Sequence, residues 1–527
     1  MTYDATIRVP SELLALMSAE NPQTLSPDGV YLFSMRTPIP AYLIALAVGR
    51  LEFRAFDSRS GVYAEPDLIG DAAAEMQYVP RMMDIAESIA GPYPWGRYDL
   101  LMMPPGYIVG GMEHPRLNFI NPSAVTRNAG VPVLPSTLIA HELAHSWAGD
   151  LVTLATWADV WLNEGITSYL ELRIIEEISG PRRAEYEWYG DRAGFADFAR
   201  QTNIPESTIL HRTTTSDHPD GFFTGTAYVK GALFMRTIED LVGRPAIDHF
   251  LRDYFAAFRL RWVDDVSFLS MLRSSLPATN SLPLAEWVYE PGLPASAGAP
   301  QTSALFNEVL AAANAFRGGA RATSPASWTT LEVDLFLNVI GDAAYPRMAE
   351  LDAAFNLSSR ATPPLVWLNH SIRSSYGPGL EAVERILMRG GPNSWMLILY
   401  RTFAETPQGM ARGRSIFERG APHYIDSVRS SIEQILKLNS LGTALVSQEA
   451  VGPGVFLVGL EMLRIDELPL VHVVELREEG IAFEFGVDPR QVHAISAMQG
   501  LGKDRRSPGD EDLLVPRRLG LADRLLQ

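Results

Sequence analysis

Two histidines four residues apart occur in the stretch HELAHSWAGD, which runs from His141 to Asp150. On an α-helix this spacing puts both imidazoles, of His141 and His145, on one face about 6 Å apart along the axis. Two ring nitrogens can then bind one ion at about 2.0–2.1 Å. Glu142 lies beside the first histidine, where its carboxylate can take a proton from an attacking water. The pattern predicts a hydrolytic zinc centre, but HExxH also arises by chance and needs support from other residues.

A catalytic zinc needs a third protein ligand and one open position. Glu164 follows His145 after eighteen residues, in the helical pattern WLNEGITSYLELRIIEEIS that ends before Gly180. A helix, a chain reversal and a second helix would return Glu164 to the ion. Glu171 lies two turns further along the same face, where it either accepts a hydrogen bond from a ligand imidazole or is a solvated helix charge.

The elements that position these residues are predicted to be helices. Ser136 precedes the first of them, STLIAHELAHSWAG, and is a candidate N-cap because its hydroxyl can accept a backbone N–H. Apolar residues recur with helical periodicity in four segments of this part of the chain: 72–90, 136–148, 163–178 and 225–242.

Composition excludes several classes of protein. The 527 residues carry a net charge of −18, which argues against a nucleic-acid-binding surface, and contain no cysteine, which excludes disulfides and thiolate ligands. The longest apolar run found, AYLIALAVG from Ala41 to Gly49, is far shorter than the roughly 20 residues of a membrane span. The N-terminus lacks a signal-peptide pattern. We therefore expect a cytoplasmic protein with no membrane span and no nucleic-acid partner.

Changes in pattern along the chain predict five regions. A Pro-, Gly- and Ala-rich linker separates a mixed, chemistry-bearing region from a helical one, and strand-like patterns recur at both ends of the chain. The regions are the end of a β-rich N-terminal domain at 1–53, a catalytic domain at 54–290, the linker at 291–303, an α-helical domain at 304–446, and an extension of unknown role at 447–527 that is partly flexible.

The motifs GGMEHP, HELAHSW and WLNEG, in this order, resemble those of the gluzincin zinc aminopeptidases, whose signature is GAMEN or GGMEN, then HExxH, eighteen residues and Glu. The likeness is closest to the leukotriene A hydrolase and aminopeptidase B branch, because it also covers VPSELLALMSA, PIPAYLIALAVG, GPYPWGRYDLL, GDLVTLATW and WVYEPGLP. The resemblance implies an α+β fold. It consists of a thermolysin-like zinc peptidase domain followed by an α-helical domain of stacked helix pairs, with a remnant of a β-rich N-terminal domain.

The resemblance implies one Zn²⁺ bound by the two histidines and Glu164, with Glu142 as the general base. It also assigns Tyr228, in the segment PDGFFTGTAYVKG, to stabilising the oxyanion of the reaction. A phenol keeps its proton at neutral pH and can donate it where negative charge develops. Without the family, Tyr228 would equally fit a core position on a helix that begins near Thr226.

In the family, the glutamate of the GxMEN segment binds the free α-amino group of the substrate. The matching residue here is Glu113, and the resemblance places Gly110, Gly111 and Met112 in the same substrate-binding segment. A carboxylate near the zinc can pair with an N-terminal ammonium and hold the first peptide bond over the metal. This chain has His114 where the family has Asn, from which we expect altered geometry or pH dependence rather than loss of the site.

The resemblance assigns further substrate contacts less specifically. Asp220 matches an acidic residue of the substrate pocket, although an Asp between Pro and Gly is also an ordinary turn residue. A basic pair of the family binds the carboxylate of the peptide, and the nearest counterparts are Arg412 and Arg414, which are offset from the expected positions. A second tyrosine of leukotriene A hydrolase is Phe223 here.

The function predicted from the sequence is that of a zinc metallo-aminopeptidase acting on short peptides with a free N-terminus. One alternative is a lipid-epoxide hydrolase of the leukotriene A hydrolase type, against which Phe223 counts because it lacks the tyrosine hydroxyl. The other is a zinc-binding but inactive interaction protein that lacks its N-terminal domain.

Overall fold

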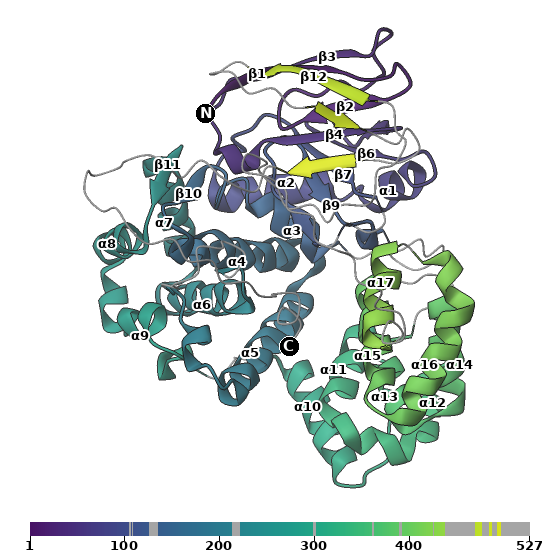
Figure 1. Cartoon of the computed structure of the whole chain (residues 1–527). Helices are drawn as coiled ribbons and strands as arrows, with labels where there is room; N and C mark the ends of the chain where they lie inside the picture. The colour runs from purple at the N-terminus through teal and green to yellow at the C-terminus, as the bar shows by residue number, and fades with distance from the viewer. Residues whose placement is uncertain are drawn as a thin grey trace, which may run out of the picture.

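The computed structural model describes residues 1–104, 107, 109–125, 135–212, 222–298, 302–360, 363–388, 393–424, 426–437, 470–476, 484–486 and 493–496. Strands from the first part of the chain form a β-rich unit, helices α2 to α9 lie beneath it, and helices α10 to α17 form a separate bundle to one side (Figure 1). The predicted α+β class is confirmed. The structure describes the extension at 447–527, predicted to be partly flexible, at 470–476, 484–486 and 493–496, and its other residues lie outside the described ranges.

The β-rich unit contains two sheets, each with strands from both ends of the chain. In β1 and β3 buried and more exposed side chains alternate, as expected for strands with one face on a core. Strand β12 pairs antiparallel with β1, and β14 pairs antiparallel with β4 (Figure 1). The sheet orders are β13-β12-β1-β3 and β14-β4-β2. The strands are β1 (Tyr3–Arg8), β2 (Leu14–Met17), β3 (Val30–Met35), β4 (Ala45–Gly49), β12 (Leu470–Leu476), β13 (Glu484–Gly486) and β14 (His493–Ser496).

A mixed five-stranded sheet follows, with the order β5-β6-β7-β9-β8. Its inner strands β6 and β7 are buried along their whole lengths, as expected for strands covered on both faces. The edge strand β8 carries Met112 and leads directly into Glu113. The strands are β5 (Glu52–Ala55), β6 (Ser60–Ala64), β7 (Tyr98–Met102), β8 (Gly111–Met112) and β9 (Asn118–Ile120), and a parallel pair is formed by β10 (Val152–Leu154) and β11 (Arg261–Val263).

The helices beneath the sheet change direction at glycines. Gly180, at which the helix of Glu164 was predicted to end, and Gly243 have φ of 91° and 82°, conformations that favour glycine, and a proline follows each at the start of the next helix. The helices are α1 (Ile69–Glu75), α2 (Val79–Ala90), α3 (Thr137–Ala144), α4 (Val160–Ser179), α5 (Pro181–Gln201), α6 (Gly231–Val242), α7 (Arg244–Ala257), α8 (Asp265–Ser275) and α9 (Leu284–Tyr289).

The ends of helix α3 differ from the prediction. Ser136 occupies the N-cap position, but its side chain makes no capping hydrogen bond, and its backbone N–H donates to the hydroxyl of Tyr78 at 3.1 Å. The helix ends at Ala144 rather than continuing to residue 148. Ser146 and Trp147 donate to carbonyls three residues back, which tightens the chain into a turn towards β10. His145 keeps helical dihedrals at the C-cap, so the two histidines remain on one face.

Helix α4 crosses α6 at two glycines that face each other. A Cβ atom at Gly165 would lie 2.6 Å from the Cα of Gly231, and one at Gly231 would lie 2.7 Å from the Cα of Gly165. Both obstacles are backbone atoms, which cannot rotate away as a side chain can. The glycines therefore allow α4 to approach the segment that carries Tyr228.

Replacing Gly165 with Ala is expected to lower the free energy of unfolding by about 1–3 kcal/mol, because the added methyl forces the two helices apart. The measurement is a comparison of urea unfolding curves. The matched control is Gly194→Ala on α5, where an added Cβ meets no atom within 4 Å. Alanine is the better helix former, so the control variant should gain up to about 1 kcal/mol. Equal stability of Gly165→Ala and the wild type would contradict this packing.

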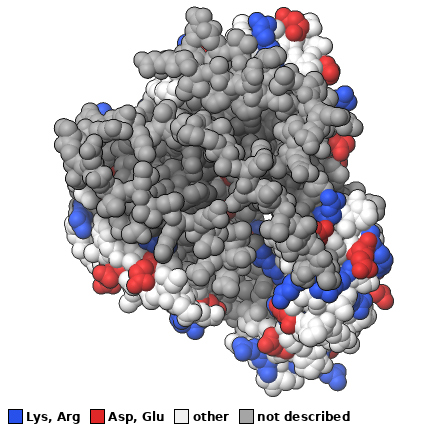
Figure 2. Space-filling model, in the orientation of Figure 1, with Lys and Arg blue, Asp and Glu red and all other residues white. Residues whose placement is uncertain are grey.

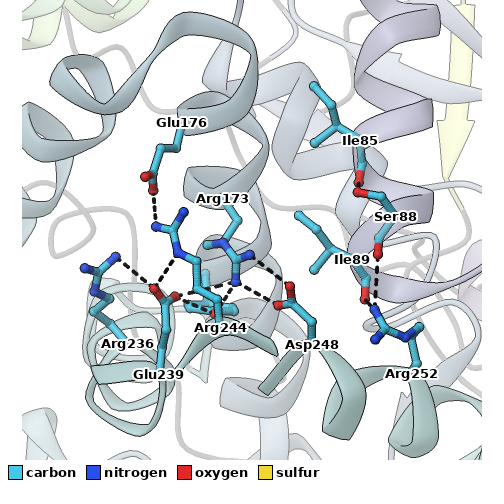
Figure 3. Close-up of polar contacts among 11 residues, drawn as sticks. Ile85, Ser88, Ile89, Arg173, Glu176, Arg236, Glu239, Arg244, Asp248 and Arg252 are labelled. Atoms are coloured by element: carbon cyan, nitrogen blue, oxygen red, sulfur yellow. Dashed lines mark hydrogen bonds and ion pairs between the residues drawn. The ribbon is translucent and has the colours of Figure 1, made fainter. Parts of the chain in front are cut away.

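A network of charged side chains fixes the other face of α4 against α6 and α7 (Figure 3). Arg173 of α4 forms two hydrogen bonds with the carboxylate of Asp248, at 2.9 and 3.2 Å, and donates to the hydroxyl of Tyr169 at 2.7 Å. Tyr169 in turn donates to Glu239 at 2.7 Å. Arg244 bridges Glu239 and Glu176, the latter at 2.5 Å. Both Arg173 and Glu239 are buried, and each has partners of opposite charge.

The remaining helices pack in consecutive pairs, α10 on α11, α13 on α14 and α15 on α16, around two apolar cores of their own. Figure 2 shows Lys, Arg, Asp and Glu intermingled over this bundle. Among the described residues, no helix has both the length and the apolar character needed to span a bilayer. The helices are α10 (Ala304–Arg317), α11 (Thr330–Ile340), α12 (Met348–Phe355), α13 (Leu365–Ser374), α14 (Gly377–Met388), α15 (Asn393–Ala404), α16 (Pro407–Gly420) and α17 (Asp426–Ile435).

Candidate metal centre

Three side-chain atoms from α3 and α4 converge at one point. The Nε2 atoms of His141 and His145 are 3.1 Å apart, and Oε2 of Glu164 lies 3.3 Å from each of them. Tetrahedral ligation at about 2.0–2.1 Å spaces neighbouring donor atoms by about 3.3–3.4 Å. The three atoms therefore have the spacing of ligands around a single zinc ion, and the prediction that Glu164 returns to the two histidines agrees with their placement.

The second nitrogen of each imidazole is also fixed. Nδ1 of His141 lies 2.9 Å from Oε2 of Glu171, and Nδ1 of His145 lies 2.9 Å from the carbonyl oxygen of Ala148 and 3.1 Å from the hydroxyl of Thr167. A carboxylate and a carbonyl can only accept, so Nδ1 carries the proton in both rings. Each Nε2 then presents its lone pair to the metal position.

The chain reversal between the two helices depends on Gly149. Its φ of 119° favours glycine, and a Cβ there would lie 2.0 Å from Oδ1 of Asn163 and 3.2 Å from Nδ1 of His145. Its N–H donates to the carbonyl of Val152 at 2.9 Å, which starts the strand β10. This tight turn lets α4 pack on α3 so that Glu164 faces the two imidazoles.

Glu142 is buried against the edge strand β8. A Cβ at Gly111 would lie 2.3 Å from Oε1 of Glu142, so only a glycine at this position lets the strand approach the carboxyl group. Burial raises the pKa of Glu142 to about 8, the nearby histidines oppose this shift, and the carboxylates of Glu113 and Glu164 add to it. The position of this buried carboxyl group beside the two histidines makes it the candidate acceptor of a proton from an attacking water.

Glu113 belongs to the same cluster. Each of Glu113, Glu142 and His145 has an oxygen or nitrogen atom, of the kind that can ligate a metal, within 4.8 Å of those of the other two. All three side chains are buried. The loop after β8 therefore brings a second carboxylate to within a few ångströms of the general-base position. A cationic group placed between Glu113 and Glu142 would be held against the metal position.

Tyr228 lies on η6 (Thr226–Lys230), a π-helical turn that precedes α6. Its ring stacks on that of His141, with centroids 5.7 Å apart and an interplanar angle of 21°. Burial, the carboxylates of Glu164, Glu113 and Glu142, and a hydrogen bond with Glu164 raise its pKa well above the ordinary value. The phenol is thus protonated at neutral pH, and the wide turn that presents it is of a kind that often occurs at functional sites.

Comparison with known proteins identifies the family. The sequence model of the peptidase family M1 domain matches residues 74–287 of this chain. Mouse aminopeptidase B is 30% identical over 465 residues, which cover 82% of this chain and 70% of the mouse protein. The chain belongs to peptidase family M1. Leukotriene A-4 hydrolase from Xenopus laevis is 34% identical over 308 residues, which cover 56% of this chain and 49% of the relative, so the match spans about half of that protein.

Solved structures of related proteins have the same fold. Yeast LTA4 hydrolase in complex with bestatin superposes with a TM-score of 0.70 at 25% identity, covering 83% of this chain and 74% of the yeast chain. The native yeast enzyme gives a TM-score of 0.72 at 24% identity, covering 82% and 74%. The prediction of a gluzincin aminopeptidase-type fold with a catalytic domain and a helical domain is therefore confirmed.

His114 is a buried structural residue in this M1 chain. Its Nδ1 lies 3.1 Å from the carbonyl oxygen of Leu43, and its ring meets that of Phe119 edge-on at a centroid distance of 4.6 Å. Burial lowers the pKa of His114 to about 4, so the ring is neutral at pH 7. The residue next to Glu113 therefore ties this loop to the segment that contains Leu43.

The structure does not place all of the other predicted substrate-binding residues beside the candidate metal ligands. Asp220 lies outside the described residues. Arg412 is exposed on α16, and Arg414 donates to the carbonyl of Leu436 at 2.7 and 3.1 Å, a contact within the helical bundle. Gly110 accepts a hydrogen bond from the N–H of Asn121 at 2.8 Å, which helps to fix the start of β8. The roles of Asp220 and Arg412 stay predictions.

Sequence reasoning missed three residues that interact with the ligands or with the neighbouring carboxylates. Thr167 lies one turn after Glu164 on the same helix face, a spacing from which its contact with His145 could have been predicted. Asp150 lies in the turn after α3, and Tyr42 lies in the β-rich unit. No local sequence pattern predicts that either residue comes close to the site. Asp150 is buried, and burial together with the charges of Glu113 and Glu142 raises its pKa well above the ordinary value.

Replacing Glu171 with Gln is expected to weaken zinc binding by about 10- to 100-fold, because the amide loses the charge that holds the proton on Nδ1 of His141. The measurement is a competition titration of the chain against a zinc chelator. Glu177→Gln, an exposed position on the same helix, is the control and should bind zinc as the wild type does. Equal affinity of the Glu171 variant and the wild type would show that the 2.9 Å contact does not support the ligand.

Proposed function

We propose that this M1 peptidase is a zinc-dependent aminopeptidase that releases the N-terminal residue of short peptides with a free α-amine. The observation that carries the proposal is the buried carboxylate of Glu113 in one cluster with Glu142 and His145. A peptide ammonium paired with Glu113 brings its first peptide bond to the general base. The similarity to aminopeptidase B supports the same activity.

The donor set supports zinc as the metal. Two imidazole nitrogens and one carboxylate oxygen, with no cysteine in the chain, are typical of catalytic zinc sites in hydrolases. M1 peptidases are zinc-dependent. We propose one ion, held by His141, His145 and Glu164. When bound, zinc supplies Lewis-acid chemistry that makes the substrate carbonyl and a water more reactive.

The residues of the chain divide the chemistry of hydrolysis among them. The Glu142 carboxylate accepts a proton from the water that attacks the first peptide carbonyl, and then passes this proton to the departing amine. The Tyr228 hydroxyl donates a hydrogen bond to the carbonyl oxygen as negative charge develops on it. Glu113 holds the ammonium of the substrate throughout, which fixes which bond is cut.

The experiment that tests the proposal uses the full chain loaded with one equivalent of zinc. Short unblocked peptides are incubated with it, and released amino acids are separated and quantified. Sequential release from the N-terminus is the expected result. Absence of release from a chain that binds zinc and unfolds cooperatively would refute the proposal and favour the alternative of a zinc-binding interaction protein.

The similarity to leukotriene A-4 hydrolase motivates a second arm of this experiment. A fatty-acid epoxide is incubated with the same preparation, and diol formation is measured. Phe223 packs on Trp157 with ring centroids 5.8 Å apart and offers no hydroxyl to an epoxide. We therefore expect peptide hydrolysis without epoxide hydrolysis, and the reverse result would establish the alternative function.

A further inference from the structure

Tyr42 presents a buried hydroxyl that has no hydrogen-bond partner in the part of the chain that the structure describes. It lies on η1 (Ala41–Leu43), a short 3-10 turn in the β-rich unit, and its phenol oxygen makes no hydrogen bond to any described residue. A buried hydroxyl left unpaired is costly, so most buried hydroxyls in native proteins have partners. An exception beside a candidate active site suggests that the partner arrives with a ligand.

The segment that carries Tyr42 contacts the segment that carries Glu113. His114, the next residue after Glu113, contacts the carbonyl oxygen of Leu43, the next residue after Tyr42, at 3.1 Å. This contact joins the two segments side by side. Burial and the charges of Glu113, Asp150 and Glu164, in that order, raise the pKa of Tyr42 well above the ordinary value, so the phenol keeps its proton at neutral pH.

The Tyr42 ring also belongs to a row of aromatic side chains. It meets the ring of Trp157 at a centroid distance of 6.2 Å, and Trp157 meets Phe223 at 5.8 Å. Trp157 begins the turn that leads into α4, the helix of Glu164. The contact with Trp157 limits the motion of the Tyr42 ring.

We propose that Tyr42 binds the substrate, with its hydroxyl oxygen accepting one N–H of the terminal ammonium that Glu113 holds. This inference rests on the proposed function. An ammonium has three N–H donors and no acceptor, and one carboxylate satisfies two of them at most in good geometry. A phenol oxygen can accept the third. The β-rich unit thereby contributes directly to recognition of the free amine.

The test is Tyr42→Phe in the full, zinc-loaded chain. Steady-state kinetics with a short unblocked peptide should show KM raised about 10-fold or more, because a hydrogen bond to a charged group is lost, with kcat within about twofold of the wild type. Leucinamide, a free-amine probe, should bind more weakly by the same factor in calorimetry, whereas N-acetylleucinamide should bind both proteins equally weakly. Unchanged KM and unchanged leucinamide affinity would overturn the proposal.

Thermal unfolding distinguishes a structural role of the Tyr42 hydroxyl from a role in substrate binding. Tyr42→Phe removes an unpaired group and should unfold at the same temperature as the wild type or a higher one. The control is Tyr31→Phe in the same β-rich unit, whose hydroxyl donates to the carbonyl of Leu13 and accepts from the N–H of Ser26, both at 2.9 Å. The control should unfold at a lower temperature with KM unchanged. A lower unfolding temperature for Tyr42→Phe with unchanged KM would assign a structural role and overturn the proposal.

Leucinamide binding, measured by calorimetry, tests the role of Tyr42 independently of peptide hydrolysis. An inactive wild type that binds leucinamide, with binding weakened in Tyr42→Phe, would contradict the peptidase activity but support the amine site. An active wild type whose variant is kinetically unchanged would contradict the role of Tyr42 alone. An inactive wild type without leucinamide binding would overturn both.

Discussion

Replacing Glu142 with Gln is expected to lower kcat for peptide hydrolysis by about 10²- to 10⁴-fold, because the amide cannot accept the proton of the attacking water. The amide has nearly the same shape as the carboxyl group, so it fits against Gly111 without moving β8. Zinc binding should persist, since Glu142 is not among the three proposed ligands. Initial rates are measured with an unblocked peptide, and bound zinc is quantified by atomic emission.

Glu177→Gln is the matched control for this substitution, because the exposed Glu177 side chain lies away from the ligand cluster on α4. It should retain the activity and zinc content of the wild type. A Glu142 variant that keeps more than about a tenth of wild-type kcat would lie outside the range expected for loss of a general base. That result would require another base, and the assignment of Glu142 would be wrong.

Replacing Arg173 with Ala is expected to lower the free energy of unfolding by about 3–5 kcal/mol. The change removes the charge at the centre of the network in Figure 3 and leaves the buried Glu239 and the half-buried Asp248 with fewer partners. It also deprives Tyr169 of a donor at 2.7 Å. Because Arg173 and Glu164 share α4, the variant should lose peptidase activity at the urea concentration at which this helix unfolds. Urea unfolding and residual activity are measured together.

Arg252→Ala is the control for this prediction. Within the described ranges, the hydrogen bonds of Arg252 are those to the carbonyl oxygens of Ser88 and Ile89, at 3.1 and 3.3 Å, at the edge of the region shown in Figure 3. Its loss should cost about 0.5 kcal/mol or less, as for most surface substitutions. If both arginine variants unfolded at the same urea concentration as the wild type, the network would not be what holds α4 in place.

The spacing of residues along helices made the ligand cluster predictable from sequence. His141 and His145 are one turn apart, and Glu164 and Glu171 are two turns apart, so each pair had to share a face. Gly180 marked the end of the second helix correctly because its backbone conformation favours glycine. The geometry of the turn at Gly149 was not predictable, because it depends on a contact with Asn163, fourteen residues further along the chain.

Features that depend on distant contacts could not be predicted. Ser136 has a capping residue type, but its backbone N–H is engaged by Tyr78, and its side chain makes no cap. The pairing of β1 with β12 joins residues more than 450 positions apart, and no local pattern specifies such a partner. The unpaired hydroxyl of Tyr42 becomes visible only when the β-rich unit is packed against the loop of Glu113.

The central claim, that Glu113 makes this M1 peptidase specific for a free amine, is tested most directly by one ratio. The value of kcat/KM is measured for a short peptide and for its N-acetylated analogue, in the wild type and in Glu113→Gln. The wild type should prefer the free amine by about 10- to 100-fold or more, the effect of one charge-assisted hydrogen bond, and the variant should lose most of this preference. Equal rates on both peptides in the wild type, or an unchanged ratio in the variant, would contradict the account.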